Sequence, residues 1–248
     1  ESNGSVRPWG DVSAKQIWKK PMAVMVDRYS ASASEIFAGA IQDYQRGIII
    51  GQKTFGKGTV QKLDDLSSGQ IKITESKFYR ITGAGMQSKG IHPDITLPST
   101  WDIEEIGESS YDTALPWDEI KPVRFKKFSM VPTLISKLND EHLTRVDQSP
   151  NLQYILDIRK RYEIQKNKEV ISLNLTNRRV EKEERQLCAL DIENKRRASL
   201  NLETFISYKA MQDYNDAKET EDDERDSEID IDNDYLLNEG MQILSDYA

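Results

Sequence analysis

The sequence predicts an α/β (α+β) fold, in which a βαβ unit and an antiparallel hairpin are followed by a mainly helical C-terminal region. First, residues 21–27 and 48–51 are short apolar runs with the length of buried strands. Second, residues 69–85 alternate apolar and polar side chains, as one strand of an antiparallel hairpin does. Third, beyond about Thr100 the apolar residues recur at the spacing of amphipathic helices.

The two apolar runs flank a segment with the pattern of a helix packed on a sheet. From Ser32 to about Arg46, the apolar residues recur on one side of a helix, beginning with Ile36 and Phe37. A strand, a helix and a second strand in this order predict a βαβ crossover, with the loops DRYSAS and GQKTFGKG at its two ends. Residues 88–99 then predict a closing turn and a short strand.

The character of the chain changes near residue 100. We expect residues 1–100 to form the α/β unit and residues 101–248 to form a mainly helical region. Asp and Glu dominate residues 216–234, where apolar side chains are almost absent, and this composition predicts a mobile acidic loop. Residues 234–247 regain helical apolar spacing, so the chain is expected to return there and dock on the body.

Composition excludes several classes of protein. The chain has 248 residues, of which 37% are hydrophobic and 31% charged, and its formal net charge of −8 argues against a general nucleic-acid binder. The sequence has no window near the roughly 18 consecutive apolar residues of a membrane span. Its single cysteine, Cys188, cannot form an internal disulfide and is expected to be a small core residue. The first residues contain neither an initiator Met nor a leader, which indicates a fragment or a processed piece.

The stretch GQKTFGKGT, residues 51–59, partly matches a nucleotide-binding loop. Gly51, Gly56 and Lys57 fit the pattern G-x-x-x-x-G-K. That loop needs Ser or Thr directly after the lysine, but Gly58 stands there and Thr59 follows one residue late. The sequence that follows favours a strand and hairpin over a helix, so nucleotide binding is a minor alternative.

Histidine-based and metal-based chemistry has little support. The two histidines are His92, expected at a turn or rim, and His142, expected on the polar surface of a helix. Without a Gly-x-Ser-x-Gly elbow, a Ser-His-Asp hydrolase is not predicted. Neither histidine has a second ligand at a typical metal spacing, and a carboxylate-only magnesium site has no motif behind it. We therefore expect no metal and no cofactor.

Serines gather where the first strand ends and the helix begins. Ser30, Ser32 and Ser34 alternate with alanines, and small residues there let a substrate backbone approach closely. The helix N-terminus offers free N–H groups and a partial positive charge to a developing oxyanion. The alternative is an ordinary helix cap, with Glu35 close behind the serine. A desolvated lysine could activate such a serine, and Lys57 is the best placed.

Residues 27–61 carry a long and specific pattern, S-A-S-A-S-E, then A-G-A and Q-D, then T-F-G-K-G-x-V-Q. This pattern closely resembles the core of the C-terminal processing peptidases, or tail-specific proteases. The stretches KFYR, KGIHPDI and ALPWD are similar to the long bacterial branch of that family, and the resemblance spans most of the chain. It implies a serine endopeptidase that uses a catalytic dyad of serine and lysine.

The resemblance assigns roles to five positions. Ser32 matches the nucleophile, Lys57 the general base, and Gln61 a glutamine that orients the lysine. The backbone N–H of Ala33 would supply half of the oxyanion hole. Asp43 matches an aspartate implicated in activity, and an exposed acid on the helix surface is the alternative for it.

The resemblance also implies parts that are not found before residue 21, namely a PDZ domain and a glycine-rich segment with the second oxyanion donor. We therefore expect the isolated chain to be inactive. The implied substrates are polypeptides with apolar C-termini, the implied location is the periplasm or cell envelope, and an envelope adaptor protein is a further implied partner. A non-catalytic binding or scaffold module, which would use the acidic loop and charged helices, is the alternative function.

Overall fold

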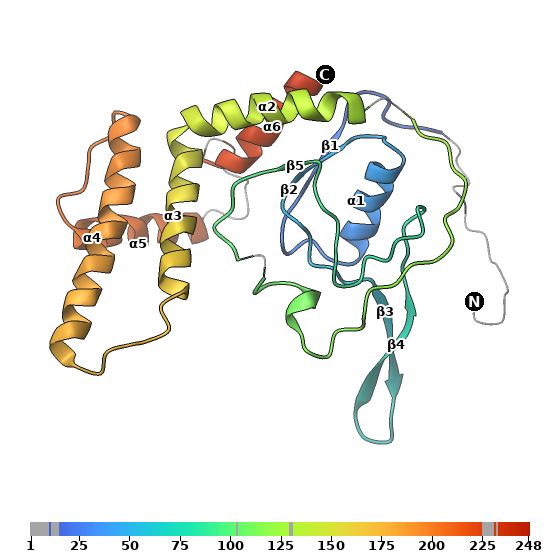
Figure 1. The fold of residues 1–248 in the computed structure, drawn as a ribbon, viewed down its shortest axis with the longest axis horizontal. Coiled ribbons are helices and arrows are strands. Elements are labelled where there is room, and N and C mark those ends of the chain that lie inside the picture. Colours follow the sequence, from blue (N-terminus) through green and yellow to red (C-terminus); the bar gives the residue numbers. More distant parts are fainter. Residues whose placement is uncertain (1–9, 11–14, 103, 129–130, 225–230, 232) are drawn as a thin grey trace.

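The computed structural model describes residues 10, 15–102, 104–128, 131–224, 231 and 233–248 of the chain. It contains an α/β core, from which a hairpin projects, and helices that extend to one side (Figure 1). The predicted α/β class with a mainly helical C-terminal region is confirmed. In the described part of the chain, no helix combines the length and the apolar character needed to cross a membrane.

The predicted βαβ unit is present. β1 (Ala23–Val26), α1 (Ala33–Asp43) and β2 (Ile48–Gly51) follow one another, and β1 pairs with β2 in parallel, with Ala23 opposite Ile48. β2 also pairs in parallel with the short strand β5 (Ile95–Thr96), so the order in this sheet is β1-β2-β5. The isoleucines of β2 are fully buried, which is typical of a parallel strand covered on both faces.

The second predicted feature, the antiparallel hairpin, is formed by β3 (Thr59–Asp65) and β4 (Gln70–Lys77). Its turn closes with a hydrogen bond from the Leu66 N–H to the Gly69 carbonyl, 3.0 Å, and Gly69 has a φ of 85° that favours glycine. Most side chains of the hairpin are exposed, and it projects from the core in Figure 1.

Helices cover both faces of the three-stranded sheet. On one face, Ile49 packs in a cluster with Ala38 of α1. On the other face, Ile48 and Ile50 pack against α2 (Pro132–Gln148) and α6 (Tyr235–Tyr247), which contribute Leu138 and Ile243. Successive residues of β2 thus point to opposite faces, as in any strand. The expectation that the last stretch returns to the body is confirmed, because Ile243 is fully buried there.

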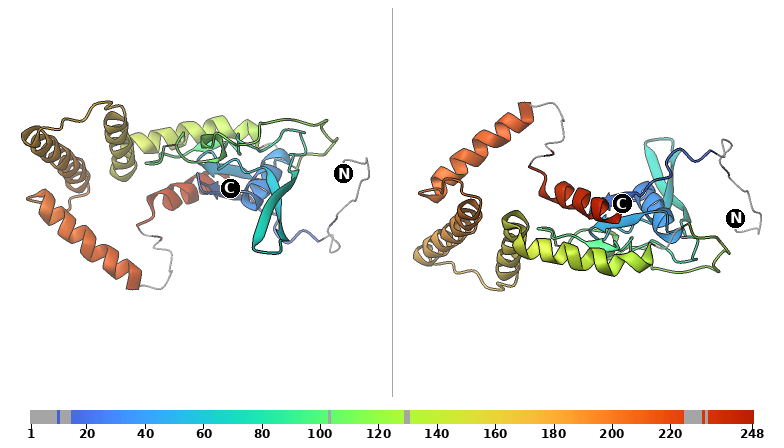
Figure 2. Two further views of the ribbon diagram at one scale, coloured as in Figure 1. Left: turned by 90° about the horizontal axis from the view of Figure 1, so that it is seen from below. Right: turned by 90° about the horizontal axis from the view of Figure 1, so that it is seen from above.

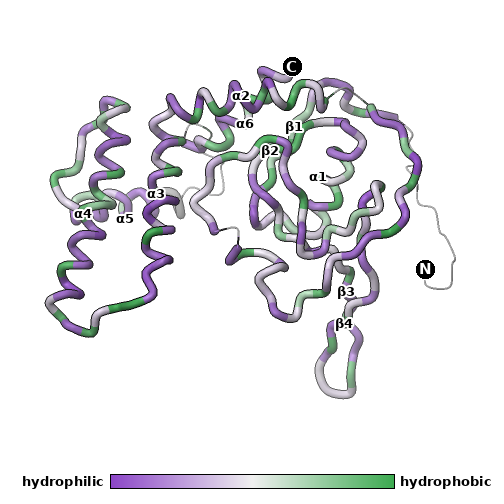
Figure 3. Tube along the Cα trace, viewed as in Figure 1, coloured by the Kyte–Doolittle hydropathy of each residue, from purple (hydrophilic) through white to green (hydrophobic). Residues whose placement is uncertain are grey.

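The remaining helices lie beside this core. η1 (Glu108–Ser110) precedes α2, and α3 (Pro150–Lys166), α4 (Leu175–Ser199) and α5 (Tyr208–Glu224) extend away from the sheet (Figure 2). We call α3, α4 and α5 the helical arm. Most of the arm is hydrophilic, whereas the strands β1 and β2 are mostly apolar (Figure 3).

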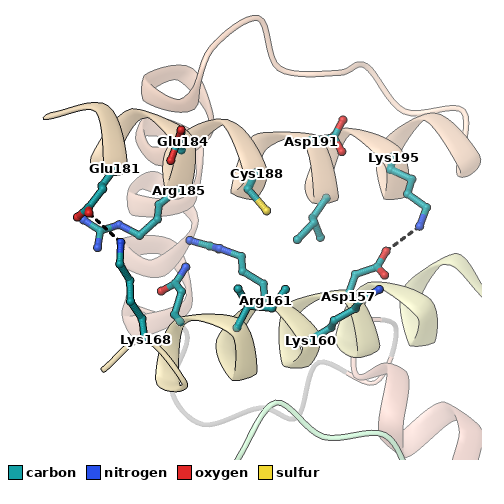
Figure 4. Close-up of a pocket in the computed structure, with 13 residues that line it drawn as sticks. Asp157, Lys160, Arg161, Lys168, Glu181, Glu184, Arg185, Cys188, Asp191 and Lys195 are labelled. Atoms are coloured by element: carbon teal, nitrogen blue, oxygen red, sulfur yellow. Dashed lines mark hydrogen bonds and ion pairs between the residues drawn. The ribbon is translucent and has the colours of Figure 1, made fainter. Parts of the chain in front are cut away.

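A groove of about 520 Å³ lies between α3 and α4 of the arm. Cys188 points into it, and ion pairs from Lys195 to Asp157, 2.7 Å, and from Lys168 to Glu181, 2.8 Å, lie at its ends (Figure 4). The expectation that Cys188 is a core residue is wrong, since its side chain is exposed. The physical reason is that α3 and α5 pack against α4 and leave part of its surface open.

Two further expectations differ from the structure. The acidic stretch is helical up to Glu224, where α5 ends, and residues 225–230 and 232 lie outside the described residues. Glu and Lys favour helix when their charges reach water, which explains the longer helix. His142 is buried, not on the surface, and its Nδ1 lies 2.8 Å from Glu239 Oε1 because α6 covers that side of α2.

Candidate active site

The turn between β1 and α1 holds Ser32 in an unusual backbone conformation. Its φ of 57° and ψ of −111° lie in a region that residues other than glycine rarely adopt. Asp27 builds the approach to this turn, because its Oδ1 accepts the N–H groups of Tyr29, 3.0 Å, and Ser30, 2.8 Å. The partly buried Ser32 is thereby placed at the start of α1.

Ser32 occupies the N-cap position, so the capping alternative and the nucleophile assignment fall on the same residue. The Ser32 N–H donates to Glu35 Oε2, 2.8 Å, as in a capping box. The next N–H, that of Ala33, is the first of the helix and has no acceptor among the residues that the structure describes. This free N–H directly after the serine is available to donate to a substrate oxygen.

One buried carboxylate connects the serine turn to the lysine loop. Glu35 is 0% exposed, and its Oε2 accepts both the Ser32 N–H, 2.8 Å, and the Lys57 N–H, 2.9 Å. Its Oε1 accepts the Gly56 N–H, 2.7 Å, and the Thr54 hydroxyl, 2.5 Å. The backbone N–H groups of the predicted nucleophile and the predicted base therefore bind the same oxygen atom. From the sequence, Glu35 is expected only as a helix cap, because its partners on the lysine loop are distant in sequence.

Arg28 lies buried beside this carboxylate and is 1% exposed. Its guanidinium donates to the Thr54 carbonyl. Burial lowers the pKa of Arg28, while the negative charge of Glu35 acts in the opposite direction. A positive group thus lies near Glu35 beneath the serine turn.

Two glycines allow the lysine loop to pack closely. Gly56 has a φ of 93°. A Cβ on Gly58 would lie 2.6 Å from the backbone nitrogen of Gln87, and the Gly58 N–H donates to Gln87 Oε1, 3.0 Å. The strand β3, not a helix, follows at Thr59. The nucleotide-binding alternative is therefore wrong, because phosphates would need a helix N-terminus there.

A cleft of about 550 Å³ borders this loop. Lys57 and Gln61 line it together with Ala31, the residue before the predicted nucleophile. Among the residues that the structure describes, Lys57 Nζ and Ser32 Oγ form no hydrogen bond with each other. Gln61 Nε2 donates to Thr74 Oγ1 at 3.4 Å, away from the lysine. The structure thus brings Lys57 and Gln61 to one cleft and holds the backbone of Ser32 close to that of Lys57, but the three side chains are not joined.

Asp43 lies at the other end of α1 from Ser32. Its carboxylate binds Arg80 in a bidentate manner, with Oδ1 2.5 Å from Nη2 and Oδ2 2.9 Å from Nε. The alternative of an exposed acid is wrong, since the Asp43 side chain is only 7% exposed. The structure does not bring Asp43 to the cleft, so any role in activity would act through Arg80, which follows β4.

Carboxylates and histidines of the described residues do not gather into a cluster that could hold a metal ion. His92, expected at a rim, is an exposed residue, and partial desolvation of its ring, followed by the nearby charge of Lys53, lowers its pKa. The cleft itself contains the Lys57 amine, and its lining includes Ala31, the residue next to Ser32, so a lysine amine is available close to a serine hydroxyl.

Two protein families match the sequence of this chain. Peptidase family S41 matches residues 2–97, and the family described as the C-terminal domain of tail specific protease (DUF3340) matches residues 101–248.

Several relatives share parts of the chain. The tail-specific protease of Haemophilus influenzae is 39% identical over 188 residues, covering 71% of this chain and 27% of that protein. The carboxy-terminal-processing protease of Bartonella bacilliformis is 45% identical over 80 residues, or 32% of this chain and 18% of that protein. Among solved structures, a photosystem II D1 C-terminal processing protease is 42% identical over 31% of this chain and 20% of that chain, with a TM-score of 0.30.

The chain thus spans about a quarter of the Haemophilus protein, 27% of its length. The match to the C-terminal domain alone covers more than half of the sequence, and the peptidase match covers the residues before it. The chain belongs to the tail-specific protease family, and it joins a segment of a family S41 peptidase to the C-terminal domain of these proteases.

Proposed function

We propose that this chain carries the nucleophile and general base of a serine endopeptidase that cleaves proteins with exposed apolar C-terminal tails. The observation that supports this proposal most strongly is the buried Glu35 carboxylate. Its Oε2 accepts the N–H groups of both Ser32, 2.8 Å, and Lys57, 2.9 Å, and so sets the two residues beside each other.

In the proposed reaction, Lys57 Nζ takes the proton of Ser32 Oγ as the oxygen attacks a substrate carbonyl carbon. The N–H of Ala33 donates to the oxyanion that develops on the carbonyl oxygen. The peptide bond then breaks, the amine leaves with a proton from Lys57, and an ester to Ser32 remains. Water, deprotonated by Lys57, hydrolyses this ester. Gln61 would orient the lysine after its side chain turns from Thr74.

The same geometry supports the proposal that the isolated chain has little or no activity. Ala33 is the only oxyanion donor that we assign among the described residues, and loss of one donor from an oxyanion hole costs about 10²–10³-fold in rate. Ser32 Oγ and Lys57 Nζ also share no hydrogen bond here. We propose that the longer protein supplies a second donor and closes this gap.

The substrate class, the compartment and the partners come from the relatives' names and from the resemblance. Tail-specific and carboxy-terminal-processing proteases act on polypeptides, as their names state. We propose a periplasmic or cell-envelope location, a substrate with an apolar C-terminus, and an adaptor protein of the envelope as a further partner.

A fluorophosphonate probe, which reacts with activated serines, tests the assignment in the full-length protein. We expect the probe to label Ser32 and the label to disappear in Lys57→Ala. Ser34→Ala is the matched control, because Ser34 is an exposed serine in the first turn of α1 and its loss should leave labelling intact. Labelling that persists in Lys57→Ala would show that this lysine is not the base. Absence of any labelling would favour the alternative, a non-catalytic binding or scaffold module.

A further inference from the structure

The cleft that holds Lys57 and Gln61 has a second wall, formed by residues 108–115. These residues lie in the part of the chain that matches the C-terminal domain, residues 101–248, and not in the peptidase match, which ends at 97. The C-terminal domain thus reaches back to the lysine loop.

Hydrogen bonds hold this wall against the lysine loop. The Glu108 N–H donates to the Phe55 carbonyl, 2.9 Å, and the Glu108 carboxylate accepts from Gln87 Nε2, 2.9 Å. The approach is close, since a Cβ on Gly107 would lie 2.3 Å from the guanidinium of Arg28. At the far end, the Ser88 hydroxyl donates to the Leu115 carbonyl, 3.3 Å. The position of the wall relative to Lys57 is therefore set by the fold.

The lining of the cleft combines apolar and polar side chains. On the wall, Tyr111 and Leu115 are 57% and 41% exposed although both are large and apolar. The Tyr111 ring lies near Phe55, with centroids 6.5 Å apart, so three large apolar side chains line the cleft. Polar side chains line it as well, namely Gln61, Thr59 and Thr74 and, on the wall itself, Glu108 and Thr113, and they can bond to peptide groups. A cleft that combines apolar side chains with a few polar groups suits an extended peptide.

We propose that residues 108–115 are a specificity wall, on which the apolar side chain of a substrate residue next to the scissile bond packs against Tyr111 and Leu115. This inference rests on the proposed function, because it assumes that peptides are cleaved beside Lys57. We infer that a substrate peptide occupies the wall, because Lys57 and the exposed side chains of Tyr111 and Leu115 line the same cavity. The wall gives the C-terminal domain a part in substrate choice.

The test measures kcat/KM of the full-length protein on peptides that carry either Leu or Glu at successive positions around the scissile bond. In Leu115→Lys, we expect the preference for Leu over Glu at one of these positions to fall by about tenfold or more, since the wall then favours an acidic side chain. Leu187→Lys is the matched control, because Leu187 is 64% exposed on α4. In this variant the ratio of kcat/KM for Leu peptides to kcat/KM for Glu peptides should stay unchanged.

Two outcomes are decisive. If Leu115→Lys changes kcat/KM of the Leu and Glu peptides by equal factors at every position, the wall does not contact substrate and the inference is wrong, while probe labelling of Ser32 still supports the proposed function. If Ser32→Ala keeps full turnover, the proposed function itself is wrong. Should Leu115→Lys fail to fold, Leu115→Ala is measured with Leu and Ala peptides, and the preference for Leu is expected to fall about tenfold.

Discussion

The α/β core and the helical arm are stabilised in different ways. The core contains isoleucines with 0% exposure on β2, β5 and α6, and a carboxylate with 0% exposure that accepts four hydrogen bonds. The arm has few buried side chains, and charged pairs such as Lys195 with Asp157 lie on its surface. Exposed ion pairs contribute little, about 0–1 kcal/mol each. The residues around the cleft are therefore placed by the buried contacts of the core and not by the surface pairs of the arm.

The largest effect that separates the two regions is expected at Glu35. Glu35→Ala removes the acceptor of four hydrogen bonds and leaves buried donors unpaired, at about 1–3 kcal/mol each. We expect a loss of at least about 3 kcal/mol in unfolding free energy and a rate loss on the order of 10²-fold. Denaturant unfolding and peptide turnover of the full-length protein measure these changes. Glu35→Gln keeps the shape of the side chain but replaces one acceptor by a donor. Its unfolding free energy and its turnover should lie between those of wild type and Glu35→Ala.

A matched pair of truncations tests the comparison directly. Ile243→Ala removes a fully buried side chain of α6 that packs on β2, and we expect it to cost about 2–5 kcal/mol. Leu187→Ala on α4, whose side chain is 64% exposed, should change the unfolding free energy by less than about 0.5 kcal/mol. Urea unfolding gives both values. Equal losses would mean that the arm is as tightly packed as the core.

Substitution of Asp43 tests whether this residue contributes to stability or to catalysis. Asp43→Ala breaks the mostly buried pair with Arg80, and we expect a loss of about 1–3 kcal/mol in stability. Because Asp43 does not line the cleft, activity measured well below the unfolding temperature should fall less than about tenfold. Arg80→Ala should match it in both measurements. A rate loss as large as that of Lys57→Ala, in a folded protein, would place Asp43 in the catalytic machinery.

The smallest change in stability is expected from the protonation of Asp102, which is bonded to Lys166 of α3. The hydrogen bond from Lys166 holds the pKa of Asp102 below its usual 3.8, so the carboxylate stabilises the fold above that pH. This contribution is lost as the pH falls through the lowered pKa. Thermal unfolding of wild type and Asp102→Asn should therefore differ near neutral pH and converge in strong acid. A difference that grows on acidification would contradict the assignment.

Much of the fold could be predicted because its signals are local. The apolar runs before Ser32 and before Gly51 predicted the parallel strands, and the alternation after Gly69 predicted the hairpin. The failures concern long-range contacts. His142 looked exposed within its own helix, and only the packing of α6 buries it against Glu239. The acidic composition predicts a loop from residue 216, whereas α5 continues as a helix to Glu224.

The order of strands and helices, the serine at the start of α1 and the glycine-rich loop around Lys57 can all be predicted from local sequence. Periodicity and turn chemistry are encoded by neighbouring residues, so they can be read without a structure. Only the tertiary structure decided that Glu35 joins the serine turn to the lysine loop and that residues 108–115 face the same cleft. Such contacts form because polar groups that become buried on folding must pair with one another. Their partners are distant in sequence, so no local pattern predicts them.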